Sequence, residues 1–246
     1  MRIAIISDIH GNLTALDAVL ADLRETSPDL IFHGGDLSDG GSRPAETLDL
    51  IRELGWQGVV GNTDEMLFDT KALTKFAGQS PKHLEPLFAA IGERAVATRE
   101  ALGEERLEWL RALPHTQIGD RMALVHASPE SLWSAPAAEA SDAELETVYS
   151  PLDRPIAIYA HIHRPSVRTM RVTRDDAEMT VANTGSVSLS YDGDRRASYL
   201  LVDESGLSIR RVEYDMEKET RALNDCGFPH SAWVARMLKA ARFEMP

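Results

Sequence analysis

The chain has 246 residues, 43% of them hydrophobic and 26% charged, a composition that excludes a disordered or fibrous protein. Its formal net charge of −13, without a compensating Lys/Arg-rich run, argues against a long nucleic acid as partner. One cysteine, Cys226, excludes an internal disulfide, and no stretch approaches the ~18 apolar residues of a membrane span. We therefore expect a cytoplasmic protein without membrane contact.

The N-terminal third predicts strands that alternate with helices. Ile3–Ile6 is an apolar run typical of a strand covered on both faces, and Asn12 is placed to cap the helix that follows. Residues 30–32 form the next apolar strand, and a helix from Pro44 leads to a strand at residues 57–60. This alternation predicts a largely parallel sheet of the α/β class (α+β in some schemes).

The rest of the chain predicts a helical segment and then antiparallel strands. Residues 64–113 read as helical, and the segment at about 65–113 is the expected lid or specificity element. A proline-containing loop separates two further strands, hairpin turns are expected at 192–194 and 204–206, and the tail from Met216 is expected to be helical. The remaining expected strands are residues 122–125, 156–159, 166–172, 178–182, 197–202 and 207–214. We expect one domain, residues 1–246, with two packed sheets.

Polar residues of metal-ligand type follow five of the predicted strands. The ends of such strands are where open α/β sheets bind ligands, so these side chains are expected to converge on one crevice. They are Asp8 and His10, Asp36, Asn62, His126, and His161 and His163.

These residue types suit a pair of divalent transition metals. Imidazole and carboxylate ligands fit Mn, Fe, Zn, Ni or Co, and one residue between two ligands lets both leave a strand end on the same side. A central carboxylate such as Asp36 can bridge two cations, and such a pair activates water for in-line attack at phosphorus. Each piece alone is weak evidence, and the prediction rests on all five together.

The same residues resemble the five sequence blocks of the calcineurin-like metallophosphoesterase superfamily. The run at 183–187 and the residues that follow it are similar to the small bacterial and archaeal phosphodiesterase branch of that superfamily. The likeness extends over residues 2–203 and is thin between 67 and 117. The blocks are Asp8-Ile9-His10-Gly11-Asn12, Gly35-Asp36, Gly61-Asn62-Thr63-Asp64, Val125-His126 and His161-Ile162-His163.

The resemblance implies a four-layer αββα sandwich of two mixed sheets flanked by helices, with a dinuclear metal site. It implies that one metal is held by Asp8, His10 and His163, the other by Asn62, His126 and His161, and that Asp36 bridges them. The metals are then two divalent transition-metal ions, with Mn as the first expectation and Fe, Zn, Ni or Co as alternatives. The expected catalytic residues are Asp8, His10, Asp36 and Asn62, around a metal-bound hydroxide as nucleophile.

One residue departs from the family pattern. Many members carry a histidine where this chain has Thr63, and a threonine hydroxyl is far too weak an acid to replace it. The chain thus lacks a contribution that a positioned acid makes, on the order of 10²–10⁴ in rate. Asn62, Thr63 and Arg164 are the predicted substrate contacts, Arg164 by its fork on a phosphate oxygen, although a surface ion pair explains Arg164 equally well.

The sequence thus predicts a phosphodiesterase or phosphatase acting on a small phosphorylated substrate. A catalytically impaired metal-binding regulator or scaffold of the same fold is the alternative, for which Thr63 is the motivating feature. A protein-phosphatase-like enzyme would need a basic groove that the acidic composition does not offer. The strand-rich C-terminal surface makes a homodimer reasonable.

Overall fold

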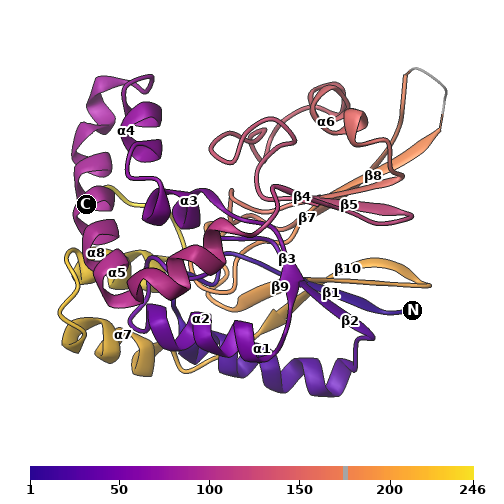
Figure 1. Ribbon diagram of the computed structural model, residues 1–246. Helices are drawn as coiled ribbons and strands as arrows, with labels where there is room; N and C mark the ends of the chain where they lie inside the picture. The colour runs from indigo at the N-terminus through magenta and orange to yellow at the C-terminus, as the bar shows by residue number, and fades with distance from the viewer. Residues whose placement is uncertain (174–176) are drawn as a thin grey trace.

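The described residues, 1–173 and 177–246 of a computed structural model, form two mixed five-stranded sheets packed face to face (Figure 1). Helices flank both sheets, which confirms the expected αββα sandwich. In the part of the chain that the structure describes, no helix is long and apolar enough to cross a membrane.

The first sheet has the strand order β10-β9-β1-β2-β3. Its N-terminal strands β1 (Ile3–Ile6), β2 (Leu30–His33) and β3 (Gln57–Gly58) run parallel, as the βαβ pattern predicts. Strands β9 (Ala197–Asp203) and β10 (Gly206–Val212) add an antiparallel hairpin on the other side of β1.

The second sheet has the order β4-β5-β6-β8-β7. Its centre is parallel, and its two outer strands run antiparallel to their neighbours. Strand β4 was not predicted, because its three residues have no distinct pattern. The strands are β4 (Thr116–Ile118), β5 (Met122–Val125), β6 (Ile156–Tyr159), β7 (Ser166–Arg171) and β8 (Glu178–Asn183).

Alternate residues of β1 serve two cores, which explains why the strand is apolar throughout. Ile3 and Ile5 pack between the sheets, and Ala4 and Ile6 pack under the helices α1 (Leu13–Thr26), α2 (Pro44–Glu53) and α5 (Glu85–Arg111). Helix α6 (Asp142–Tyr149) covers the outer face of the second sheet. The predicted cap is present, because the side chain of Asn12 accepts a hydrogen bond from Ala15 N at 2.9 Å.

The helical segment predicted at 64–113 consists of several pieces. They are α3 (Asn62–Phe68), α4 (Ala72–Ala77), a short 3₁₀ turn (Lys82–Leu84) and the long α5, which Gly103 interrupts with a φ of 68°. The expected helical tail is two helices, α7 (Met216–Asp225) and α8 (Ser231–Ala240). Helix α8 packs on α7 and, with Trp233 and Val234, joins a core with Ala90 of α5.

Two expectations for the loops are wrong. The proline-containing stretch between β5 and β6 contains α6, whose start is a capping box between Ser141 and Glu144. Residues 192–194 do not form a hairpin turn, because β8 and β9 belong to different sheets. The turn at 204–206 does join antiparallel neighbours, β9 and β10.

Candidate metal centre

The predicted ligands meet at one end of the sandwich, where both sheets present the carboxyl ends of parallel strands. In Figure 1 this end lies toward α3, α5 and α8. Asp8, His10 and Asp36 follow strands of the first sheet, whereas His126 and the pair at 161 and 163 follow strands of the second. The crevice therefore lies between two sheets, which the sequence did not indicate.

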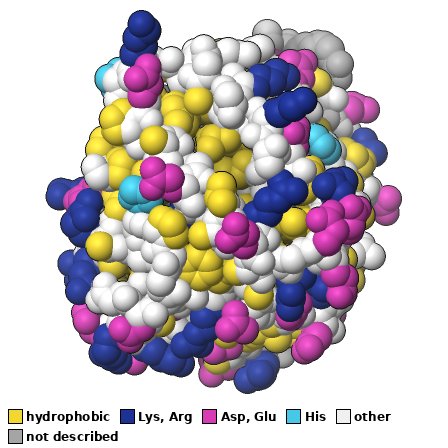
Figure 2. Space-filling model, turned by 60° about the vertical axis from the view of Figure 1, so that its left-hand side comes forward, with side chains coloured by type: hydrophobic (Ala, Val, Ile, Leu, Met, Phe, Trp, Pro, Cys, Tyr) yellow, Lys and Arg dark blue, Asp and Glu magenta, His cyan; other side chains and the backbone are white. Residues whose placement is uncertain are grey.

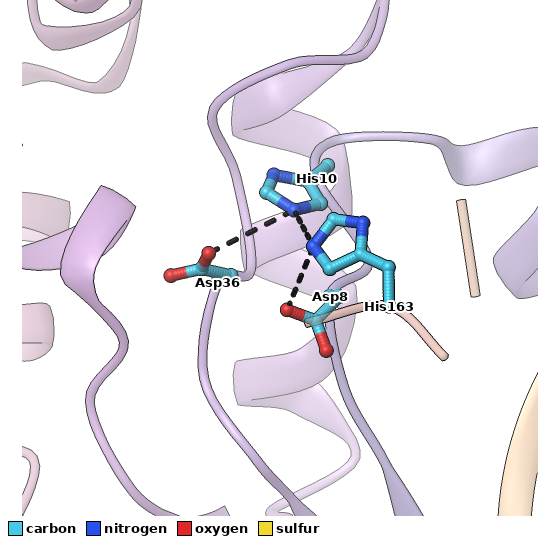
Figure 3. Close-up of side chains that lie close together, drawn as sticks. All are labelled: Asp8, His10, Asp36 and His163. Carbon is cyan, nitrogen blue, oxygen red and sulfur yellow. Dashed lines mark hydrogen bonds and ion pairs between the residues drawn. The ribbon is translucent and has the colours of Figure 1, made fainter. Parts of the chain in front are cut away.

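Asp8, His10, Asp36 and His163 form a buried cluster (Figure 3) whose ligand atoms all lie within 4.8 Å of one another. His163 Nε2 lies 3.2 Å from Asp8 Oδ1 and 3.3 Å from His10 Nε2. His10 Nε2 lies 3.7 Å from Asp36 Oδ2. This is a set of nitrogen and oxygen atoms that could hold a metal ion.

A second group adjoins the first through Asp36. His126 Nε2 lies 3.5 Å from Asp36 Oδ1 and 2.9 Å from Asn62 Oδ1, and His161 Nδ1 lies 2.9 Å from the same amide oxygen. The two oxygens of Asp36 thus face different histidines. This is the arrangement that a carboxylate needs to bridge two cations.

The histidine rings are held by their outer nitrogens. Nδ1 of His10, His126 and His163 lies 2.6, 2.8 and 2.5 Å from the carbonyl oxygens of Asp39, Gly34 and Leu189. A backbone carbonyl only accepts, so each Nδ1 donates, and in the neutral ring Nε2 carries a lone pair.

Acceptors therefore face acceptors inside the cluster. The Nε2 atoms of His10 and His163 point at each other, and Asp8 Oδ1 has no hydrogen-bond partner among the described residues. Such a set is repulsive until a proton or a cation enters it. The residues present thus fit a bound metal.

Burial and neighbouring charges shift the pKa values of the histidines and of Asp8. Burial lowers the pKa of His10, and it lowers the pKa of His161 to about 4, so both rings are neutral at pH 7. Burial also acts on His163, but the Asp8 carboxylate outweighs it and raises the pKa of that imidazole. Burial would raise the pKa of Asp8, yet His163 holds it well below its usual range. The raised pKa of His163 and the lowered pKa of Asp8 both favour the ion pair between them.

The backbone around the cluster is strained. Asp8, His10, Asp36, His161 and His163 have φ values of 51°, 50°, 56°, 66° and 56°. Left-handed conformations are uncommon for residues with a Cβ and cost about 1 kcal/mol or more each. Their gathering at one site indicates that ligand placement has been favoured over local stability.

Asp64 organises the loops that carry Asp36 and Asn62. Its carboxylate accepts hydrogen bonds from the backbone N–H groups of Asp36, Leu37 and Gly61 at 2.8, 2.9 and 3.1 Å. Burial and the nearby Asp36 raise its pKa to about 7. Asp64 was predicted only as part of a block. The signal for its role is its place as the third residue of α3, where its carboxylate accepts a hydrogen bond from the N–H of Gly61, the residue before the helix.

The hydroxyl group of Ser7 and two hydroxyl groups after β8 hold Asp8 in place. Ser7 Oγ donates to Asp8 Oδ2 at 2.5 Å and lies 2.6 Å from Thr184 Oγ1. Ser186 Oγ donates to the backbone oxygen of Asp8 at 2.9 Å. The run at 183–187 therefore acts behind the cluster, as a support for its first ligand.

The remaining polar residues near the strand ends divide into two kinds. Thr63 adjoins the cluster: its N–H donates to Asp36 Oδ1 at 2.9 Å, and its hydroxyl is without a partner among the described residues. Arg164 is exposed and pairs with Glu139 at 3.0 Å, which argues against the predicted substrate contact. His33 is fully buried with its ring near Trp109, away from the ligands.

A family model described as the calcineurin-like phosphoesterase superfamily domain matches residues 1–206. An uncharacterized protein of Methanocaldococcus jannaschii is 31% identical over 233 residues, which cover 88% of this chain and 89% of that protein. The crystal structure of a metallophosphoesterase from Sphaerobacter thermophilus has a TM-score of 0.74 and 28% identity, with 98% of this chain and 99% of that chain covered.

More distant similarity links the chain to nucleotide hydrolases. The symmetrical bis(5'-nucleosyl)-tetraphosphatase of Pectobacterium carotovorum is 27% identical over 169 residues. The match covers 65% of this chain and 55% of that enzyme, so it spans about half of the relative's length.

Proposed function

This chain belongs to the calcineurin-like phosphoesterase superfamily, and from this premise we propose that it hydrolyses a small phosphodiester or phosphomonoester with two divalent cations. The observation that carries the proposal is the position of Asp36. Its two carboxylate oxygens face His10 on one side and His126 on the other, within a buried cluster.

In this proposal the seven predicted ligands divide into two sets that share Asp36. When bound, the two cations would lower the pKa of a water molecule and neutralise the oxygens of the phosphoryl group. Manganese is the first metal to test, and Fe, Zn, Ni and Co are alternatives. The sets are Asp8, His10 and His163 for one cation, and Asn62, His126 and His161 for the other.

The chain's own groups orient the ligands and the substrate. Backbone carbonyls keep the Nε2 lone pairs of His10, His126 and His163 turned inward. Thr63 lines the cavity beside the cluster, and its hydroxyl oxygen is buried without a partner among the described residues. It cannot protonate a leaving group, so we expect esters of acidic alcohols, which leave without a proton, to react fastest.

The test is metal-dependent hydrolysis of p-nitrophenyl phosphate and bis(p-nitrophenyl) phosphate by the full chain with Mn²⁺. We expect Asp36→Asn and His126→Ala to lower kcat by about 10³-fold or more, because lost electrostatic stabilisation at a reacting centre costs at least this order. The control is Asp17→Asn, an exposed carboxylate on α1. Undiminished turnover in both site variants, with their folds intact by circular dichroism, would contradict the proposal.

Thr63 supports a second candidate, a metal-binding regulator or scaffold with impaired catalysis. Elemental analysis would then find cations bound to the purified chain, while no phosphoester is hydrolysed. A screen of cyclic nucleotides, dinucleoside polyphosphates, phosphopeptides and sugar phosphates separates the two candidates. The name of the Pectobacterium carotovorum relative makes dinucleoside polyphosphates the first substrates to try.

A further inference from the structure

A cavity of about 210 Å³ opens directly onto the candidate metal centre. A larger hollow of about 710 Å³ lies elsewhere, between α6 and residues 128–136, and none of the predicted ligands lines it. The floor of the smaller cavity is polar and belongs to the centre. It is made by His10, Asp36, Asp39, Gly40, Asn62, Thr63, His161 and His163.

The rest of the lining, apart from Arg94, is apolar, and we call it the apolar wall. It comes from α5 with Leu87 and Ile91, from α8 with Trp233, Val234 and Met237, and from Leu189, Tyr191 and Phe243. Figure 2 shows the face that carries these helices, where apolar side chains gather toward the middle and most charged side chains lie toward the rim. The α8 and tail residues lie beyond residue 206, where the family match ends.

Three aromatic side chains of the wall are held in defined orientations. The ring of Tyr191 stacks on His163 with centroids 4.6 Å apart and planes at 14°, and Phe243 meets Tyr191 edge-on at 5.9 Å. Trp233 donates from Nε1 to the backbone oxygen of Glu244 at 2.7 Å, which fixes the tail that carries Phe243. Phe243 is 46% exposed, so it stands at the mouth of the cavity.

The two charged side chains of the lining outside the predicted ligand set already have partners. Arg94 donates to the carbonyl oxygens of Gly41 and Pro229 at 2.6 and 2.9 Å, with only Nε lacking a partner among the described residues. Asp39 accepts a hydrogen bond from Thr98 at 2.5 Å. The occupant of the wall side is therefore expected to be uncharged.

The size of the cavity limits that occupant. Pockets that enclose whole drug-sized ligands measure roughly 300–1,000 Å³. The 210 Å³ here must also contain the phosphoryl group above the floor. What remains fits about one flat ring system, and flat rings stack or meet edge-on with aromatic side chains.

We propose that the apolar wall binds a flat, uncharged ring of the substrate's organic group, such as a nucleobase or an aryl ring, and so selects aromatic over aliphatic phosphoesters. The inference rests on the proposed function, because it places the ester's phosphoryl group at the metal centre. It goes further by naming the residues of α5, α8 and the tail that determine specificity.

The test compares two stable ligands with the same anionic group, phenylphosphonate and methylphosphonate. Calorimetric titration of the Mn²⁺-loaded full chain measures the affinity for each. We expect phenylphosphonate to bind about tenfold tighter or more, the order expected when a ring stacks on aromatic side chains. Phe243→Ala should reduce this preference at least about threefold. Leu87→Trp, which fills the cavity beside the apolar wall, should abolish the preference. The affinity for methylphosphonate should stay unchanged in both variants.

Two controls lie next to the tested positions but outside the wall. Val96→Ala is on the exposed side of α5, and Met245→Ala is in the same tail as Phe243. Both should keep the wild-type preference. Three results would overturn the inference: equal binding of the two phosphonates by the wild type, a preference that survives both wall variants, or an equal loss of affinity for both ligands.

Hydrolysis of p-nitrophenyl phosphate is measured on the same samples. A retained ring preference without any turnover would instead contradict the proposed function.

Discussion

The floor and the wall of the cavity are built by different means. The floor consists of short polar side chains at strand ends, on strained backbone, and backbone carbonyl oxygens fix the imidazoles of His10 and His163. The wall consists of larger apolar side chains on α5, α8 and the tail, held by packing. The sheets thus determine which reaction is available, and the helices determine which organic group reaches it. A substitution in the floor should leave the preference for an organic group intact, and a substitution in the wall should leave the reaction intact.

The largest effect that separates the two regions is expected from Asp64→Ala, which acts on the floor alone. The substitution leaves the N–H groups of Asp36, Leu37 and Gly61 without their buried acceptor. Each such group costs about 1–3 kcal/mol, so we expect the free energy of unfolding to fall by about 3–5 kcal/mol. Cation affinity should fall about 10–100-fold, because Asp64 positions a ligand without touching the metal.

Urea denaturation and Mn²⁺ titration measure these two losses. Asp69→Ala is the matched control, an exposed carboxylate just after α3. The ratio of phenylphosphonate to methylphosphonate affinity should stay at the wild-type value, because the wall is intact. A variant that binds Mn²⁺ as tightly as the wild type would show that Asp64 does not position the ligand loop.

An effect of about 3 kcal/mol is expected from pH at His33, which lies outside both the floor and the wall. The ring lies on β2 near Trp109 of α5, and burial lowers its pKa from 6.5 to about 4. The unfolded chain takes up a proton near pH 6.5, whereas the folded chain does so only near pH 4. The folded state therefore loses stability as the pH falls from 6.5 to 4, by about 3 kcal/mol in total.

Removing the titrating group should remove this part of the pH dependence. We expect His33→Leu to lose less stability between pH 6.5 and 4 than the wild type, in urea denaturation series run with EDTA. The contributions of other histidines cancel in the difference between the two proteins. Parallel stability curves for both proteins over this pH range would show that His33 is not held neutral by burial.

Much of the fold follows from the sequence because β1, β5 and β6 are buried on both faces and therefore apolar throughout. Elements without that constraint were not predicted. Strand β4 has three residues at the edge of its sheet, and α6 lies among prolines that suggested a loop. The turn at 192–194 has ordinary hairpin residues, and only the partition of β8 and β9 between two sheets shows that it is not one.

The meeting of the polar side chains in one cluster could be predicted because strand ends carry these residues at fixed places in the chain. The apolar wall could not. Leu87 and Met237 belong to helices 150 residues apart, and each looks like an ordinary core residue in its own helix. The place of His33 could not be predicted either. A histidine at a strand end has the same local sequence whether its side chain faces the cluster or the core.

The smallest effect is expected from Arg164→Ala. Arg164 directly follows the ligand His163, yet its side chain lies on the surface, pairs with Glu139 and does not line the cavity. Exposed ion pairs contribute at most about 1 kcal/mol, so the free energy of unfolding should hardly change. Because the side chain belongs neither to the floor nor to the wall, KM for p-nitrophenyl phosphate and the phosphonate preference should both change less than about twofold. Glu139→Ala removes the partner and should behave in the same way.

A rise in KM of about tenfold in Arg164→Ala alone would contradict this prediction. It would show that the arginine side chain leaves Glu139 and binds a phosphate oxygen, since charge-assisted bonds of that kind contribute about this much. The division into floor and wall would then need a third, mobile part.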